Sequence, residues 1–321
     1  MTKTAGRETA ERIKRRGKEL GFDLVGITAA EPLERESLHL QEWLDLGFHA
    51  SMGWMARTVD KRGDPRKILE GARSVIVAGL NYYAPVAHRD DLETGKISRY
   101  AWGEDYHKIV LEKLEAYSVW LSETYPGSSA LAYADTGPLM EKALAAKAGI
   151  GWLGKHTNII SPEYGSWLFL GEIVTTLDVP PDEPATDHCG SCSLCIDACP
   201  TGAIVEPYVL DAGKCISYLT IEHRGEFPER APRNFEGWIF GCDICQDVCP
   251  WNQKFGRPTT DRRFFPKEGQ EAPSLREWAR MTADEFPGRF AGSPIKRAKW
   301  EGLMRNIRIV LEGNGRTASA P

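Results

Sequence analysis

The sequence predicts an α/β layered domain of α+β character, followed by a small cysteine-rich domain and C-terminal helices. Two observations support this division. Strand-like and helix-like apolar segments are mixed up to about residue 178, whereas all eight cysteines lie between residues 189 and 249. A proline-rich acidic segment, VPPDEPATD (179–187), separates the two regions. We therefore expect domains at 1–178, 179–255 and 256–321.

The elements of the first domain follow from their hydrophobic patterns. Residues 8–21 and 108–125 carry apolar side chains at helical spacing. Short apolar and β-branched stretches predict strands at 23–30, 74–84, 130–138 and 165–177. Pro138 stands where a further helix is predicted to begin, and Gly149 and Gly151 end it.

Composition and charge exclude some classes of protein. The chain has 321 residues and a net charge of −5, so contact with nucleic acid or an anionic membrane needs a local basic patch. No apolar run is long enough to span a bilayer. The charged N-terminus lacks the apolar core of a secretory or twin-arginine signal, which predicts a cytoplasmic protein. In that reducing compartment, clustered cysteines favour metal ligation over disulfides.

The cysteines fall into two similar runs. CGSCSLCIDACP (189–200) holds four, CDICQDVCP (242–250) holds three, and Cys215 is the only one left. In two-cluster ferredoxins the fourth cysteine of each run binds the other cluster. Zinc sites instead use isolated cysteine pairs, often with histidine. We therefore predict two [4Fe–4S] clusters with crossed ligands: Cys189, Cys192, Cys195 and Cys249 for one, and Cys199, Cys215, Cys242 and Cys245 for the other.

Two such clusters transfer electrons but do not define a reaction. The preceding domain is expected to hold the electron acceptor, and the long insertion between Cys215 and Cys242 could reach that site. An alternative is an electron-transfer module that docks on a separate oxidoreductase.

The densest group of polar residues lies between 133 and 167. Asp135 follows a predicted strand, where ligands commonly bind in layered folds. It could instead cap the next helix. A helix N-terminus lowers the pKa of a carboxyl group, whereas a proton donor at neutral pH needs a raised pKa. The loop GWLGKHTN (151–158) is either a polar cradle or a plain turn.

Several motifs in one order carry a family resemblance. They are the cysteine pattern, SMGWM (51–55), RYAWGEDYH (99–107), DTGPLMEKALAAKAGIGWLGKHTNIIS (135–161) and CISYLTIEHRG (215–225). With these motifs the chain resembles the epoxyqueuosine reductase family, from about residue 21 to residue 252 and into the C-terminal helices.

The resemblance implies a fold, cofactors and a reaction. It implies a cobalamin-binding domain of nitroreductase-like type, related to that of reductive dehalogenases, followed by a ferredoxin-like domain with two [4Fe–4S] clusters. The substrate would be epoxyqueuosine at the wobble position of tRNA, reduced to queuosine, with Asp135 as the proton donor. Matching positions make the following residues candidate cobalamin contacts: Arg57, Ser98, Arg99, Asp135, Lys155, Thr157, Asn158 and Ser217.

Cobalamin in this family is held base-off, without a histidine ligand. Proteins that ligate cobalt through histidine use D-x-H-x-x-G, and here Val110 replaces the glycine after Asp105 and His107. His107 is therefore expected to be a hydrogen-bonded surface residue.

The implied partners are tRNA carrying epoxyqueuosine and an electron donor such as a flavodoxin or ferredoxin, with the enzyme a monomer and no membrane involved. The segment 293–308 combines five basic residues with Trp300, which suits phosphate contact and base stacking, although a solvated basic helix face is an equal alternative. The rival function is a cobalamin-dependent reductase of small molecules, of reductive dehalogenase type.

Overall fold

A four-stranded sheet forms the centre of the N-terminal half in the computed structural model, which describes residues 3–229 and 231–313. Every neighbouring pair of its strands is antiparallel. The strand order is β1 (Leu24–Ala29), β2 (Ser74–Asn81), β7 (Leu168–Thr175), β4 (Ala130–Tyr133). All eight residues of β2 are buried, as expected for a strand covered on both faces. The antiparallel pairing makes this half an α+β fold.

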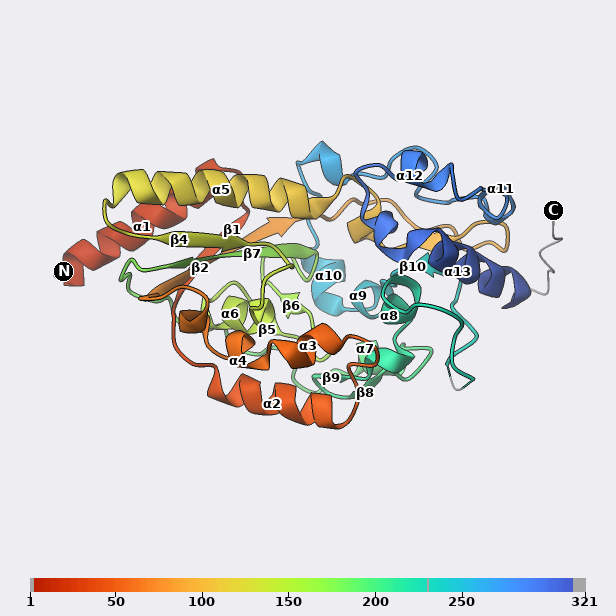
Figure 1. Ribbon diagram of the computed structural model, residues 1–321, viewed down its shortest axis with the longest axis horizontal. Helices are drawn as coiled ribbons and strands as arrows, with labels where there is room; N and C mark the ends of the chain where they lie inside the picture. The colour runs from red at the N-terminus through yellow and green to blue at the C-terminus, as the bar shows by residue number, and fades with distance from the viewer. Residues whose placement is uncertain (1–2, 230, 314–321) are drawn as a thin grey trace.

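Helices cover both faces of the sheet (Figure 1). On one face, α1 (Lys3–Glu19) and α5 (Tyr106–Thr124) pack against the sheet. On the other, α6 (Glu141–Lys147) packs against the sheet, and α2 (Glu34–Asp45) lies further out on the same side. Gly171 of β7 permits the close approach of α5, because a Cβ atom there would lie 2.7 Å from a side-chain carbon of Leu114. Short elements complete this half: α3 (Gly53–Arg57), α4 (Val59–Arg62), β5 (Trp152–Leu153), β6 (Ile159–Ile160) and 3₁₀ turns at Pro65–Lys67 and Arg99–Ala101.

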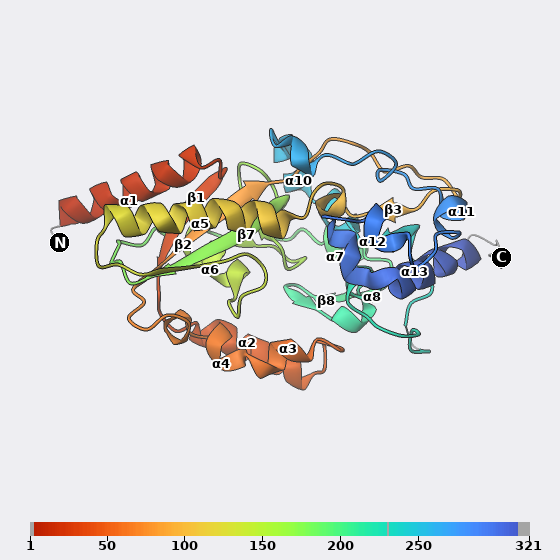
Figure 2. The same cartoon turned by 45° about the horizontal axis from the view of Figure 1, so that its top comes forward.

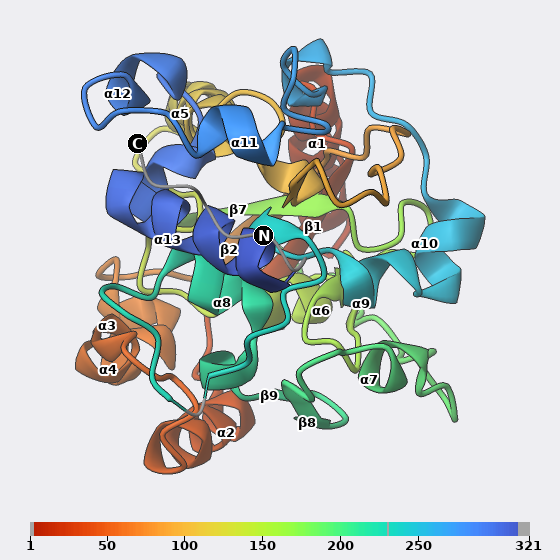
Figure 3. The same ribbon diagram turned by 90° about the vertical axis from the view of Figure 1, so that its right-hand side faces the viewer.

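The cysteine lobe, residues 189–255, consists of short elements around the two cysteine runs. Each run contains one helical turn, and these two helices, α7 and α9, pack against each other on the same side of the molecule (Figure 3). The elements are α7 (Leu194–Asp197), β8 (Ile204–Glu206), β9 (Val209–Leu210), a 3₁₀ turn at Ala212–Lys214, α8 (Ile216–Ile221), β10 (Trp238–Phe240), α9 (Ile244–Asp247) and α10 (Pro250–Phe255).

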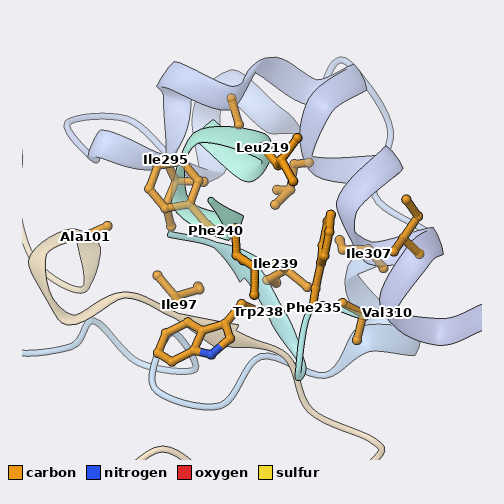
Figure 4. Close-up of a cluster of buried hydrophobic side chains, with 14 of the residues drawn as sticks. Ile97, Ala101, Leu219, Phe235, Trp238, Ile239, Phe240, Ile295, Ile307 and Val310 are labelled. Atoms are coloured by element: carbon orange, nitrogen blue, oxygen red, sulfur yellow. The ribbon is translucent and has the colours of Figure 1, made fainter. Parts of the chain in front are cut away.

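The C-terminal helices share a hydrophobic core with the cysteine lobe and with a segment of the N-terminal half (Figure 4). In this core β3 (Lys96–Ile97) pairs in parallel with β10, and α13 (Lys299–Gly313) lies beside α8 (Figure 2). Residues on both sides of the predicted boundary after residue 178 therefore pack together. The remaining elements are a 3₁₀ turn at Arg262–Phe264, α11 (Leu275–Trp278), α12 (Phe286–Arg289) and a 3₁₀ turn at Pro294–Ala298.

Most predicted elements of the N-terminal half are present, with shorter bounds. The four predicted strands are β1, β2, β4 and β7, and the predicted helices at 8–21 and 108–125 correspond to α1 and α5. The helix predicted to begin at Pro138 instead begins at Glu141, so residues 134–140 form an irregular loop. Within residues 3–229 and 231–313, no helix is long and apolar enough to cross a membrane.

Candidate active site

Asp135 lies in the loop between β4 and α6, and its backbone is strained. Its φ angle is 60°, in the left-handed region that non-glycine residues seldom adopt. Its backbone N–H donates a 2.6 Å hydrogen bond to Oε1 of Glu141. The alternative that Asp135 caps the next helix is wrong, because Met140 occupies the N-cap position of α6. Strained backbone conformations of this kind are concentrated at functional sites, so the contacts of the Asp135 carboxylate are of interest.

The carboxylate of Asp135 accepts two hydrogen bonds from the start of α5. The Tyr106 hydroxyl donates to Oδ2 over 2.6 Å, and Nε2 of His107 lies 3.2 Å from the same oxygen. The other imidazole nitrogen, Nδ1, lies 2.7 Å from Oδ1 of Asp105. Asp105 is also the N-cap of α5, so the cap that starts the helix also orients the histidine. The expected surface histidine is thus hydrogen-bonded, and it belongs to the Asp135 site.

These contacts decide where the proton resides. Asp135 is exposed at the surface; partial desolvation raises the pKa of its carboxyl group, but the hydrogen bonds from His107 and Tyr106 outweigh this and leave that pKa below its ordinary value. Burial lowers the pKa of His107, and its bonds to Asp105 and Asp135 more than offset this, giving a pKa of about 9. At neutral pH the pair is therefore an imidazolium beside a carboxylate, with the available proton on His107.

Lys142 joins the loop of residues 151–158 to the Asp135 site. Its ammonium group donates to the carbonyl of Thr157 over 2.8 Å and to Oδ1 of Asn158 over 3.0 Å. Thr157 also has a positive φ angle, 65°. Lys142 interacts electrostatically with Asp135. Two of the predicted residues, Thr157 and Asn158, therefore contact a lysine whose charge acts on Asp135.

Lys155 lies elsewhere, against the first cysteine run. Its ammonium group donates to the backbone carbonyls of Gly190 and Cys192, over 2.5 Å and 2.9 Å. Ser217 is half-buried in α8, and its carbonyl accepts from the Thr220 hydroxyl. Arg57 is exposed at the end of α3.

Ser98 and Arg99 are buried and bind the loop of the second cysteine run. The Ser98 hydroxyl donates to Asp243 over 2.5 Å. The backbone N–H and the guanidinium of Arg99 both donate to Asp243, and the guanidinium also donates to Asp247 over 2.7 Å. These contacts tie the segment before α5 to the cysteine lobe.

The eight cysteines are free thiols that gather in two groups. A pocket is lined by the four residues of the first predicted cluster, Cys189, Cys192, Cys195 and Cys249. In the second group, Cys245 interacts electrostatically with Cys215 and Cys199, and Cys242 with Cys245 and Cys215; Cys245 also interacts with Cys195 of the first group. Cys192 is exposed, whereas Cys195 and Cys249 are buried. Over the described ranges, no three Cys, His, Asp or Glu side chains gather as they would around a single metal ion.

Two unpartnered N–H groups lie near the first group of cysteines. Nδ1 of His156 accepts from the backbone of Asn158, which assigns the imidazole proton to Nε2. Burial lowers the pKa of His156 to about 4, so the ring is neutral. Nε2 of His156 and Nε1 of Trp152 are buried without a partner among the described residues. His156 lines the cysteine pocket, and Trp152 packs with Cys249. Such donors fit a cluster, whose sulfur atoms accept hydrogen bonds.

The insertion between Cys215 and Cys242 contacts Arg297, whose charge interacts with Asp135. Glu222 accepts two hydrogen bonds from the guanidinium of Arg297, at 2.9 Å and 2.8 Å, and Arg224 donates to the Arg297 carbonyl. The same guanidinium lies 5.7 Å from the ring centre of Trp54 in α3 and interacts electrostatically with Asp135. Residues far apart in sequence therefore meet at one edge of the site.

The basic segment 293–308 is less uniform than its sequence suggests. Arg305 is buried and donates to the backbone carbonyls of Leu219, His223 and Gly225. Trp300 is half-buried, and its indole N–H donates to the Met281 carbonyl. The exposed basic side chains are those of Lys296, Arg297, Lys299 and Arg308.

Sequence reasoning missed Tyr106, Glu141, Lys142 and Glu172. Tyr106 directly precedes the histidine of the DYH motif, and Glu141 and Lys142 follow the DTGP motif within the same quoted stretch, so proximity to those motifs was an available signal. Glu172 stands inside an apolar strand, GSWLFLGEIVTTL, and is completely buried. A charged residue at such a position was a signal in itself.

Comparison with known proteins shows which family the chain resembles in sequence. Two family models match: a 4Fe-4S double cluster binding domain over residues 188–252, and epoxyqueuosine reductase QueG, DUF1730, over residues 62–136. An epoxyqueuosine reductase of Synechocystis sp. is 48% identical over 291 residues, which cover 90% of this chain and 100% of the relative. That of Leadbetterella byssophila is 44% identical, covering 95% and 99%.

The fold is also similar to that of solved structures. A crystal structure of epoxyqueuosine reductase with an epoxyqueuosine-modified tRNA-Tyr stem loop has a TM-score of 0.88 and 30% identity, covering 96% of this chain and 82% of that one. A Bacillus subtilis epoxyqueuosine reductase whose catalytic aspartate loop is swung out of the active site has a TM-score of 0.86 and 30% identity, with the same coverage. The chain belongs to the epoxyqueuosine reductase family, and it contains a 4Fe-4S double cluster binding domain.

Proposed function

We propose that this protein reduces epoxyqueuosine in tRNA to queuosine. The observation that carries the proposal is the hydrogen-bonded pair of His107 and Asp135 in a chain of this family that also holds a double-cluster domain. The reaction breaks both C–O bonds of the epoxide and forms a C=C bond. It consumes two electrons and two protons, and the oxygen leaves as water.

Cobalamin, held base-off, is the proposed second cofactor. When bound, it would supply the cobalt chemistry that opens the epoxide. His107 fits a site without a histidine ligand, because each of its ring nitrogens already faces a carboxylate oxygen. Lys142, Thr157 and Asn158 form a polar group beside Asp135 that suits the amide side chains of the corrin ring.

The other predicted cobalamin contacts divide into two sets. Arg57 and Ser217 stay predictions for cofactor contact. The side chains of Ser98, Arg99 and Lys155 are engaged by protein groups around the cysteine runs. We propose that these three hold the cysteine loops in place.

The Asp135 site would supply the protons. Oδ2 of Asp135 accepts from both Tyr106 and His107, so it is a fixed point at which a proton can be passed on. The imidazolium of His107 gives its proton to Asp135 as Asp135 protonates the departing oxygen. Asp105 keeps the imidazole oriented while the charge changes.

The cysteine lobe would supply the electrons. We propose that the cluster bound by Cys189, Cys192, Cys195 and Cys249 receives them, because Cys192 is exposed and can be approached by a donor such as a flavodoxin or ferredoxin. The second cluster would pass them on. Its ligands Cys215 and Cys245 interact electrostatically with Lys142 of the Asp135 site.

We propose a separate role for each of the three predicted domains. Residues 1–178 would form the nitroreductase-like cobalamin domain, residues 179–255 the ferredoxin-like domain, and residues 256–321 a helical segment that contacts tRNA through Lys296, Lys299 and Arg308. The last eight residues of that segment, 314–321, lie outside the described structure. We propose a monomer that acts in the cytoplasm.

A cobalamin-dependent reductase of small molecules is the weaker alternative, because the relatives that are 40–48% identical are named epoxyqueuosine reductases. A bare electron-transfer module would not need the Asp135 site.

The test is an anaerobic incubation of reconstituted protein, cobalamin and a low-potential reductant with tRNA that carries epoxyqueuosine. The tRNA is then digested, and its nucleosides are measured by mass spectrometry. We expect a cobalamin-dependent loss of one oxygen atom. No conversion, with both clusters and cobalamin verified in place, would contradict the proposal. Turnover of a halogenated small molecule without tRNA would favour the alternative.

A further inference from the structure

Glu172 is a buried acid that no part of the proposed reaction uses. It lies in β7, opposite Val77 of β2 and Tyr133 of β4, and its side chain is 0% exposed. Neither of its carboxyl oxygens has a partner at normal hydrogen-bonding distance among the described residues. An isolated buried carboxylate is costly, and a buried polar group without a partner is rare in folded proteins. Its position therefore calls for a specific explanation.

The acidic group that affects Glu172 most is Glu141, the first residue of α6. Glu141 is also the residue whose Oε1 accepts the backbone N–H of Asp135. Glu172 is thus coupled to Glu141 through its electrostatic interaction, and Glu141 is hydrogen-bonded to the strained residue that presents the catalytic carboxylate. We call Glu141 and Glu172 the carboxyl pair.

We propose that the carboxyl pair is a latch, in which a neutral Glu172 donates its proton to the Glu141 carboxylate, and Glu141 in turn holds the Asp135 loop in its inward position. Both are positioning residues, because they act through Asp135. The inference deepens the proposed function and rests on it. Asp135 has a backbone φ angle in the left-handed region, and such a conformation persists only when surrounding contacts hold it.

Charges around the pair support this arrangement of protons. Burial and then the neighbouring Glu141 raise the pKa of Glu172 well above its ordinary value, so it stays protonated. Burial and then the Asp135 charge raise the pKa of Glu141 to about 7, so it changes charge near neutral pH. Two cations face Glu141: Lys142 from α6 and Arg62 from α4.

The first test measures the latch without substrate. Glu172→Gln keeps a permanent donor in the same shape, whereas Glu172→Leu removes the donor at similar volume. Hydrogen exchange of a peptide containing the Asp135 amide is followed by mass spectrometry on cluster-containing protein. We expect wild-type protection in Glu172→Gln and at least about tenfold faster exchange in Glu172→Leu. Unchanged protection in Glu172→Leu, or lost protection in Glu172→Gln, would overturn the latch.

The second test uses the pH profile of queuosine formation. Wild-type turnover should rise through about pH 7, because the ionised Glu141 accepts a stronger hydrogen bond from the Asp135 amide. Without its donor Glu141 ionises at higher pH, so the midpoint should rise in Glu172→Leu but not in Glu172→Gln. Equal midpoints in the two variants would contradict the latch. If no queuosine forms at all, the proposed function fails, while the exchange measurement still decides the latch.

Discussion

The Asp135 site and the surroundings of the first cysteine group are completed in different ways. In the Asp135 site the polar groups satisfy one another: the carboxylate of Asp135 accepts two hydrogen bonds, and both nitrogens of His107 have a partner. Beside the cysteines, Nε1 of Trp152 and Nε2 of His156 are buried without a partner in the described chain. The protein builds its proton site itself, whereas the electron site needs its clusters to complete it.

The two sites therefore depend on different interactions for their geometry. Hydrogen bonds and a strained loop set the geometry of the proton site, so single substitutions should change turnover while the lobe stays intact. The cysteine lobe consists of helices and strands of only a few residues. Such short elements are not stable alone, so metal ligation should contribute to its folding.

The largest expected effect comes from removing a cluster ligand. Cys215→Ala should lower the iron content by about one cubane, roughly half the total, and abolish queuosine formation because the second cluster is lost. Iron analysis of the reconstituted protein measures this. Ser217→Ala, two residues further on in α8, is the control and should keep all of its iron. Unchanged iron in Cys215→Ala would refute the crossed ligand assignment.

His107→Gln tests whether His107 supplies a proton at the Asp135 site. We expect turnover to fall roughly 10- to 100-fold, because the glutamine cannot supply a proton, with both clusters retained. In the wild type His107 is protonated below a pKa of about 9, so turnover should fall as the pH rises through 9, and the variant should lack this fall. Any stability that its raised pKa contributes is fully present below pH 6.5 and lost through about 9.

The matched control is His39→Gln, on the exposed face of α2. It should leave both the rate and the alkaline fall unchanged. An alkaline fall that persists in His107→Gln would assign it to another group.

Arg305→Met tests whether the C-terminal helix stabilises the insertion. Arg305 donates to three backbone carbonyls, and its guanidinium lies 4.0 Å from the ring centre of Phe227. Leaving those carbonyls buried without donors should lower the free energy of unfolding by about 2–3 kcal/mol. A urea titration measures the loss, with exposed Arg308→Met as the control. Equal midpoints would show that the helix does not support the insertion.

The smallest expected effect concerns tRNA. Lys296→Ala removes an exposed charge from the basic segment and should weaken tRNA binding about two- to fivefold, while reducing the salt dependence. Arg15→Ala is the matched control, because α1 lies at the opposite end of the molecule from α13 (Figure 1). Equal weakening in both variants would mean that only overall charge matters.

Local pattern was enough to predict much of the fold. Alternating and continuous apolar stretches located the four strands of the central sheet, and the cysteine spacing located the cluster lobe. Local pattern could not predict that β3 pairs with β10, because these strands are more than a hundred residues apart. It also misplaced the start of α6, since Pro138 favours a first helical turn but the DTGP segment forms a loop.

Site residues that lie in sequence motifs could be predicted, whereas those brought to the site by tertiary packing could not. The position of Asp135 after a strand identified it, whereas its partners Tyr106 and His107 come from α5, which only the folded chain brings beside it. Arg99 opens the RYAWGEDYH motif and Ser98 directly precedes it, yet the side chains of both bind Asp243. A motif therefore gives the neighbourhood of a residue and not its contacts.

The central claim is that proton supply and electron supply reside in separate regions, and Asp135→Asn tests it most directly. Both clusters are reduced anaerobically, their spectra are recorded, and a single turnover of epoxyqueuosine-containing tRNA is then followed. We predict clusters that are present and reduced as in the wild type, with queuosine formation slowed roughly 100-fold or more. Wild-type turnover in this variant, or loss of cluster reduction together with turnover, would contradict the account.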